Sequence, residues 1–224
     1  YNKGVAKHKV RDAKPFKGVF TGNERTVKTS LTVDDISRLA ALELPEDSFL
    51  ALARDVFVFS FCTMGLPPVD LFRLTYSHIK DDKLVYSRHK TGNQVVVPIN
   101  GQMETIIKRY RQDGCNLLFP RFLRMSYRSQ YNRALKTLAG KAGIGGSLSS
   151  YSARRSWASM ANEAGVSINI ISQALGHSNI TTTMYYLAQI DCEKLRESNG
   201  IVLGKLRVAP ICKRCTNAPK QLQR

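Results

Sequence analysis

Residues 83–99 interrupt an otherwise helical sequence pattern, and this interruption most limits the folds open to the chain. Two β-rich runs, Lys83-Leu-Val-Tyr-Ser and Gln94-Val-Val-Val-Pro-Ile, flank the turn-forming segment Lys90-Thr-Gly-Asn. Such runs around a glycine-containing turn predict a β-hairpin, here with Lys90 at its tip. We therefore expect a mainly α fold of the α+β class, with a small β-hairpin sheet.

Apolar residues recur at helical spacing on both sides of the hairpin. Thr32 and Asp35 resemble a capping pair at the start of a first helix. The next predicted helix, from Phe49 to Ser60, is more apolar, so we expect it to be central. Pro67 and Pro68 then begin a new helical turn. Later helices are predicted around Met103–Tyr110, Tyr127–Ala142, Ala153–Ala164, Ile168–Leu175 with Ser167 as its cap, and Thr181–Ala188.

The charge of the chain is strongly positive and lies mostly at the two ends of the sequence. The 224 residues include 34 Lys and Arg against 17 Asp and Glu, which gives a formal charge of +17. Residues 1–30 and residues 205–224 each carry +6. Positive arms of this kind neutralise the phosphates of nucleic acid, so we expect a polyanionic partner. The alternative is that the charge only keeps the protein soluble.

The sequence predicts neither a membrane span nor a secretion signal. The longest nearly apolar run, from Val56 to Val69, covers 14 positions, whereas crossing a bilayer takes roughly 20. The chain starts at Tyr1 without a charged start and an apolar segment after it, so we expect an internal fragment of a cytoplasmic protein. The cysteines are odd in number and mostly scattered, which fits reduced thiols: Cys62, Cys115, Cys192, Cys212 and Cys215.

Two blocks near the carboxyl end have a specific residue order. They are Ser147-Leu-Ser-Ser-Tyr-Ser-Ala-Arg-Arg-Ser-Trp-Ala-Ser and Ala174-Leu-Gly-His-Ser-Asn-Ile-Thr-Thr-Thr-Met-Tyr-Tyr. With the hairpin segment Arg88-His-Lys-Thr-Gly, they resemble the catalytic domain of tyrosine recombinases (phage integrase family), particularly the branch of bacterial conjugative transposons. The resemblance runs from about residue 31 to 204. It implies that residues 1–30 are the remnant of a core-binding domain with its linker, and that residues 205–224 form a basic tail.

The resemblance implies four catalytic residues, Arg154, His177, Tyr186 and Lys90. In the family, the tyrosine attacks a DNA phosphodiester and becomes linked to the 3′-phosphate. The planar arginine can donate two parallel hydrogen bonds to that phosphate, the histidine supplies another donor, and the lysine protonates the leaving oxygen. Tyr185 competes as the nucleophile, but the family spacing selects Tyr186. No cofactor, metal or ATP is needed, because the phosphotyrosyl bond conserves the energy of the cleaved diester.

Each of these residues also has a structural interpretation. Arg154 could make a surface salt bridge, His177 could cap the helix that ends at Leu175, and Tyr186 could be a core aromatic residue. Their joint order along the chain favours the catalytic interpretation. Arg155 is either a phosphate contact or surface charge.

Two groups of the family pattern are missing. Residues 64–70, Met-Gly-Leu-Pro-Pro-Val-Asp, lack the family's first arginine, since Pro67 stands at the usual position and Met64 at the alternative one. Tyr151 stands in place of a histidine and can donate a hydrogen bond. Loss of one phosphate donor typically costs about 10²–10³-fold in rate, so we expect a substitute. Arg54 is the first choice and Arg73 the second; alternatively, Arg54 faces solvent.

The resemblance implies double-stranded DNA as the partner, with four protomers on two DNA sites and a Holliday junction as the intermediate. In this fragment alone a monomer is the alternative state, and the full protein would be cytoplasmic and nucleoid-associated. Two other functions stay open: a catalytically impaired recombinase-like DNA-binding protein, and a type IB topoisomerase-like activity. Cys212 and Cys215 have the spacing of half a zinc site, but no second ligand pair is near, which favours a solvated basic tail.

Overall fold

The computed structural model describes residues 30–122, 127–146 and 148–187. In this part of the chain, no helix is long and apolar enough to cross a membrane. The predicted core-binding remnant, the basic tail and the Cys212–Cys215 pair lie outside the described residues. The side chains of Tyr185 and Tyr186 also lie outside them, although the backbone there is described.

Helix α3 (Phe49–Cys62) is the centre of the fold, as its apolar sequence predicts. Ser48 begins it by accepting a hydrogen bond from the backbone N–H of Ala51. Apolar side chains lie on all sides of this helix, which is the pattern of a buried helix. Four other helices pack against it: α2 (Val33–Ala40), α5 (Gly101–Arg109), α6 (Tyr127–Lys141) and α7 (Ser152–Glu163).

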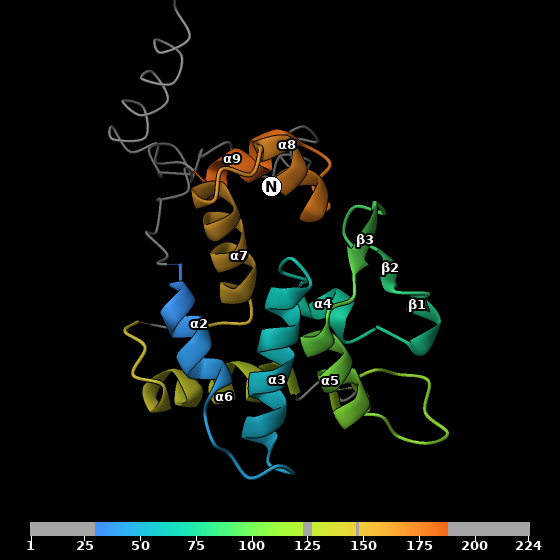
Figure 1. Cartoon of the computed structure of the whole chain (residues 1–224), viewed down its shortest axis with the longest axis vertical. Coiled ribbons are helices and arrows are strands. Elements are labelled where there is room, and N and C mark those ends of the chain that lie inside the picture. Colours follow the sequence, from blue (N-terminus) through green and yellow to red (C-terminus); the bar gives the residue numbers. More distant parts are fainter. Residues whose placement is uncertain (1–29, 123–126, 147, 188–224) are drawn as a thin grey trace, which may run out of the picture.

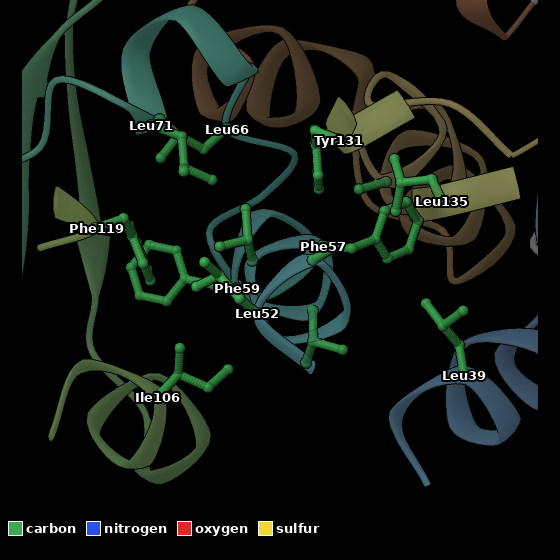
Figure 2. Close-up of a cluster of buried hydrophobic side chains, with 14 of the residues drawn as sticks. Leu39, Leu52, Phe57, Phe59, Leu66, Leu71, Ile106, Phe119, Tyr131 and Leu135 are labelled. Atoms are coloured by element: carbon green, nitrogen blue, oxygen red, sulfur yellow. The ribbon is translucent and has the colours of Figure 1, made fainter. Parts of the chain in front are cut away.

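The main hydrophobic core forms where these helices meet α3. Figure 2 shows Phe57 and Phe59 of α3 among side chains from segments that are distant in the sequence, namely Leu39, Ile106, Phe119 and Leu135. The capping pair predicted at the start of α2 is confirmed, since Thr32 and Asp35 each accept a hydrogen bond from the backbone N–H of the other. The body of the protein is therefore a helical bundle around one buried helix.

A three-stranded antiparallel sheet lies beside this body. Its strands, in the order β1-β2-β3, are β1 (Ile79–Lys80), β2 (Lys83–Ser87) and β3 (Gln94–Pro98). The predicted hairpin of β2 and β3 is confirmed, with Tyr86 opposite Val95, whereas the short strand β1 was not predicted. Two short helical turns, α4 (Pro68–Leu71) and η1 (Tyr76–His78), connect α3 to the sheet. A mainly helical fold with a small sheet is confirmed.

The last helices form a second, smaller cluster. Figure 1 shows α7 leading from the body to α8 (Ile168–Ala174) and α9 (Ile180–Tyr186). Its core is built from Ala158, Ile171 and Leu175. Ser167 caps α8 as predicted, by accepting a hydrogen bond from the backbone N–H of Ile170. Because α8 also packs against β3, the carboxyl-terminal helices meet the hairpin.

Candidate active site

Arg154 lies where three segments of the chain meet. It occupies the first turn of α7, and only 3% of its surface is exposed. Its Nη1 donates a hydrogen bond to the carbonyl oxygen of Gly65 at 3.0 Å, and its Nη2 donates to that of Leu175 at 2.6 Å. The interpretation of Arg154 as a surface salt bridge is therefore wrong. The guanidinium instead joins α7 to the loop after α3 and to the end of α8.

Gly65 makes this close approach possible. Its φ of +77° lies in the left-handed region, and a Cβ at this position would lie 2.4 Å from the Cα of Arg154. Any side chain would therefore force the loop and α7 apart. The loop also contains the positions where the first arginine is missing: Met64 is half-buried and Pro67 is buried.

His177 is held at the end of α8 by the Leu175-Gly176-His177 sequence. The backbone N–H of Gly176 donates to the carbonyl of Gln173 and that of His177 to the carbonyl of Ser172. With Gly176 at φ +63°, this is the Schellman arrangement that ends a helix. The backbone of His177 thus caps the helix, as the structural interpretation held, while its ring is left to make contacts elsewhere.

The imidazole ring of His177 bridges Arg154 and α9. Its Nε2 lies 2.9 Å from Nη2 of Arg154, and its Nδ1 lies 2.8 Å from Oγ1 of the buried Thr183. Arginine can only donate, so Nε2 is the acceptor and carries no proton in this contact. Burial lowers the pKa of His177 to about 4, and the nearby charges of Arg154, Arg88 and Lys90 add to this effect. The ring is therefore neutral near pH 7.

The hairpin packs against Gly176, the glycine that ends α8. Thr91 Oγ1 donates to the carbonyl oxygen of Gly176 at 3.1 Å. A Cβ on Gly176 would lie 2.7 Å from Cγ of Arg88 and 2.9 Å from Cγ2 of Val95. Lys90 is exposed at the turn, and its charge is close enough to lower the pKa of His177. Hence the structure brings Lys90, Arg154 and His177, predicted from three separate motifs, to one place.

Arg88 is a third cation at this place, beside Lys90 and Arg154, and none of the sequence motifs selects it. Only 8% of its side chain is exposed, and its Nη1 lies 3.1 Å from Oδ2 of the buried Asp70. Asp70 Oδ1 accepts a hydrogen bond from the backbone N–H of His89 at 2.8 Å. Strand alternation could have revealed Arg88, because Leu84, Tyr86 and Arg88 occupy the same, inward-facing side of β2 and its extension. We call Arg88, Lys90, Arg154 and His177 the cation cluster.

The structure does not bring Arg54 to the cation cluster. Its Nε donates to Asp55 Oδ1 at 2.7 Å, and its Nη1 donates to the carbonyl of Leu42. Along α3, Arg54 precedes the last helical residue, Cys62, by eight residues, or roughly 12 Å at 1.5 Å per residue, and the loop with Gly65 lies beyond that end. The interpretation that Arg54 faces solvent also fails, because its side chain is only 12% exposed.

The other predicted residues have more peripheral positions. Arg73 is exposed, with its Nη1 2.6 Å from Nδ1 of His89 at the hairpin. Arg155 is half-buried and donates to Ser152 Oγ. Tyr151 precedes α7 with 49% of its surface exposed and makes no capping hydrogen bond through its side chain. Tyr186 is the last residue of α9, and its side chain is not described.

A polar pocket opens beside His177. It has a volume of about 430 Å³, and its lining includes Asn93, Asn169, Gln173 and Ile180. The amide side chains can form hydrogen bonds with a polar ligand there. Among the described residues, no group of three or more His, Cys, Asp or Glu side chains could hold a metal ion.

The sequence matches one family profile and several curated proteins. Residues 30–192 match the profile of the phage integrase family. Tyrosine recombinase XerA of Pyrococcus furiosus is 29% identical over 185 residues, which cover 78% of this chain and 62% of that protein. Tyrosine recombinase XerD of Brucella suis is 26% identical over 176 residues, which cover 70% of this chain and 57% of that protein. The chain thus spans about three-fifths of the length of these curated relatives.

Solved structures share the fold at lower identity. A lambda integrase dimer bound to a COC′ core site superposes with a TM-score of 0.63 at 18% identity, covering 83% of this chain and 68% of that one. The Tn1549 transposon integrase in complex with transposon right end DNA gives a TM-score of 0.59 at 17% identity, covering 84% of this chain and 70% of that one.

Proposed function

Because the chain belongs to the phage integrase family, we propose that it is a site-specific DNA recombinase, which cleaves and rejoins double-stranded DNA through a 3′-phosphotyrosyl intermediate. The observation that carries the proposal is the contact of Arg154 with His177, 2.9 Å apart and beside the hairpin of Lys90. These three side chains come from distant parts of the sequence. Their convergence gives a compact positive site for a phosphodiester.

In the proposed cleavage step, the phenol oxygen of Tyr186 forms a bond to the phosphorus atom. The bond from phosphorus to the 5′-oxygen breaks, and this oxygen takes a proton from the ammonium group of Lys90. The phenolic proton passes to water. Rejoining reverses these steps with the 5′-hydroxyl of a partner strand, so the number of phosphoester bonds is unchanged and no ATP is consumed.

The role of the cations is to stabilise the charge on the non-bridging oxygens of the transition state. Arg154 is suited to this because its guanidinium is held by two backbone carbonyls, so it does not have to reorganise during the reaction. His177 is neutral before the phosphate arrives. A phosphate would add negative charge beside the ring, which raises the pKa of His177 and favours its protonated, donating form.

The position of Tyr186 in α9 agrees with this role. Thr183 is hydrogen-bonded to His177, and residue 186 follows it by three positions in the same helix. Positions three apart share one side of a helix. Position 186 therefore lies on the side of α9 that meets His177, and we infer that Tyr151 is an additional hydrogen-bond donor of the site.

The wider biological setting is part of the same proposal. The positive ends of the sequence fit a double-stranded DNA partner. We propose that four protomers act on two DNA sites in the cytoplasm, at the nucleoid, and that the recombinase serves a mobile element. The likeness to a transposon integrase supports the last point.

A second function is favoured by one observation. The positions expected to carry the first arginine are Met64 and Pro67, neither of which is a cation. If no other residue supplies that charge, the chain is a DNA-binding relative of recombinases with impaired catalysis.

Trapping of the covalent intermediate tests the proposal. The full-length protein is incubated with a pool of nicked DNA duplexes of random sequence, in which a short leaving strand diffuses away after cleavage. Adducts that survive denaturation are isolated, and the attached DNA is sequenced to recover the target site. Tyr186→Phe is the test variant, and Tyr185→Phe is its matched control.

We expect adducts from the wild type and from Tyr185→Phe, and none from Tyr186→Phe. An adduct that persists in Tyr186→Phe and disappears in Tyr185→Phe would identify the other tyrosine as the nucleophile. DNA binding without any adduct from the wild type would support the impaired alternative.

A further inference from the structure

We propose that Arg88, at the end of β2, supplies the second guanidinium of the phosphate site and thereby replaces the family arginine missing at Pro67. This inference rests on the proposed function, since it concerns the same scissile phosphate. It changes the origin of the cation: the charge comes from the hairpin rather than from the loop after α3.

The position of Arg88 is fixed by the residues that also fix His177. Its side-chain stem lies against Gly176, where an added Cβ would come within 2.7 Å of Cγ. Gly176 directly precedes His177, and the carbonyl before it, that of Leu175, accepts a hydrogen bond from Arg154. The charge of Arg88 is close enough to lower the pKa of His177, and both Arg88 and Arg154 act on the pKa of the buried Tyr86. The two arginines therefore flank one small volume.

The donors of Arg88 are buried but incompletely used. Among the described residues, Nε and Nη1 of Arg88 have no hydrogen-bond partner, and neither does Asp70 Oδ2. The 3.1 Å separation of Nη1 and Oδ2 makes an ion pair, but the groups are not aligned as a hydrogen bond. Leaving a buried charged donor unsatisfied is costly. A phosphate, whose oxygens can accept two parallel bonds from one guanidinium, is the ligand that would remove this cost.

The other candidate arginines lack this property. Both Arg54 contacts are hydrogen bonds with good acceptors, Asp55 and the Leu42 carbonyl, about two helical turns or more from the site. Arg73 is exposed and contacts His89 on the outer side of the hairpin. Arg88 is thus the arginine that is buried, next to His177, and short of acceptors.

A purely structural role for Arg88 makes different predictions. In that case the Asp70–Arg88 pair only anchors the hairpin, and its loss would lower stability without changing how the enzyme responds to the charge on the phosphate. A variant that keeps the stem and removes the charge, Arg88→Met, preserves the packing on Gly176. Arg88→Lys keeps the charge beside Asp70 and removes the planar fork.

The first experiment measures adduct formation on the DNA site recovered from the nicked pool. We expect Arg88→Met to react about 10²–10³-fold more slowly than the wild type, and Arg88→Lys to recover part of the rate. Arg73→Ala, which removes an arginine from the same hairpin region, serves as the matched control and should change the rate less than about threefold. Circular dichroism and thermal unfolding confirm that each variant is folded.

The second measurement replaces the scissile phosphate by a neutral methylphosphonate. Its missing charge reduces the need for a second cation, so the defect of Arg88→Met should shrink at least about tenfold relative to the wild type on the same substrate. A structural role predicts an equal defect on both substrates. An unchanged rate for folded Arg88→Met, or an equal defect on both substrates, would overturn the inference and leave the proposed function standing.

A third measurement does not depend on recombination. The guanidinium ¹⁵N resonances of Arg88 and Arg154 are followed by nuclear magnetic resonance while inorganic phosphate is added to the full-length protein. We expect both to shift with one apparent Kd. Absence of a response at Arg88 would overturn the inference. Absence of any adduct from the wild type, with both arginines responding to phosphate, would instead reject the proposed chemistry and keep Arg88 as an anion ligand.

Discussion

Asp55 and Asp70 are both buried and both lie next to an arginine, but their hydrogen bonding differs. Asp55 on α3 accepts hydrogen bonds from Arg54 at 2.7 Å, Arg109 at 2.9 Å and the hydroxyl of Tyr110 at 2.7 Å. We call these four residues the Asp55 cluster. Asp70 accepts one aligned bond, from the backbone of His89, and its contact with Arg88 leaves donors and acceptor unsatisfied.

The difference separates a structural network from a site that needs a ligand. In the Asp55 cluster, the oxygens of one carboxylate receive three side-chain donors, and the contact with Asp55 raises the pKa of Arg109. In the cation cluster, positive groups gather and lower the pKa of His177. A network whose donors all have acceptors stabilises the fold, whereas gathered positive groups with unsatisfied donors are stabilised by binding an anion.

Neutralising each of the two carboxylates in turn should give the largest difference in the free energy of unfolding. Asp55→Asn keeps the shape but weakens three charge-assisted bonds, so we expect a loss of about 3–5 kcal/mol in the free energy of unfolding. Asp70→Asn should cost less, about 2 kcal/mol, because the amide oxygen keeps the bond from the His89 backbone although Arg88 loses its counter-charge. Urea unfolding of both variants measures the difference. Equal losses would show that the Asp70–Arg88 pair is as structural as the Asp55 cluster.

Alanine substitution of two glycines should give a stability difference of intermediate size. One glycine lies in the helical body and the other beside the cation cluster. At Gly176, alanine meets a φ of +63° and close contacts with Arg88 and Val95, so we expect Gly176→Ala to lose about 2–3 kcal/mol of stability. Gly140 lies within α6 with no atom within 4 Å of an added Cβ. Gly140→Ala should therefore stabilise the protein by about 0.5–1 kcal/mol. Thermal unfolding compares the two.

The activities of the glycine variants add a second readout. The displaced stem of Arg88 should also slow adduct formation by Gly176→Ala, while Gly140→Ala should react like the wild type. A Gly176→Ala protein with unchanged stability and rate would mean that the hairpin can move away from α8 without consequence.

Sequence reasoning predicted those parts of the fold that depend on local patterns. The hairpin followed from β-rich runs around Lys90, the capping pair of α2 from Thr32 and Asp35, and the central position of α3 from its apolar length. Each depends on residues close in the sequence. The convergence of Lys90, Arg154 and His177 could be expected only from the resemblance to a family, because their contacts cross the chain.

The prediction of a substitute arginine shows where this reasoning stops. A charge within an apolar helix, such as Arg54, suggests a functional role, but such a charge is equally well stabilised by a neighbouring carboxylate, and Asp55 is adjacent. The burial of Arg88 depends on Asp70 from α4 and on Gly176 from the end of α8. Neither contact can be predicted from the spacing of nearby residues in the sequence. The one local signal is the alternation along β2, which places Arg88 on the inner side with Tyr86.

The pH dependence of stability should give the smallest of these effects. The pKa of His177 is lowered to about 4 in the folded protein, against about 6.5 for an unperturbed histidine. The unfolded chain therefore binds its proton first as the pH falls, so this residue's contribution to stability is complete above about pH 6.5 and is lost between there and pH 4. We expect a loss of about 1–2 kcal/mol over this range, after allowing for partial exposure of the ring.

The comparison of wild type with His177→Asn isolates this contribution, because asparagine does not titrate. Unfolding by urea at pH 7 and pH 4.5 should show a smaller drop in the variant than in the wild type. Saturating phosphate should reduce the drop in the wild type further, since an anion among Arg88, Arg154 and His177 raises the pKa of the ring. The same phosphate should change the drop of His177→Asn much less, because asparagine has no pKa for the anion to raise. If phosphate changed both in equal measure, the anion would act by general screening, and the distinction between the two buried aspartates would lose its functional meaning.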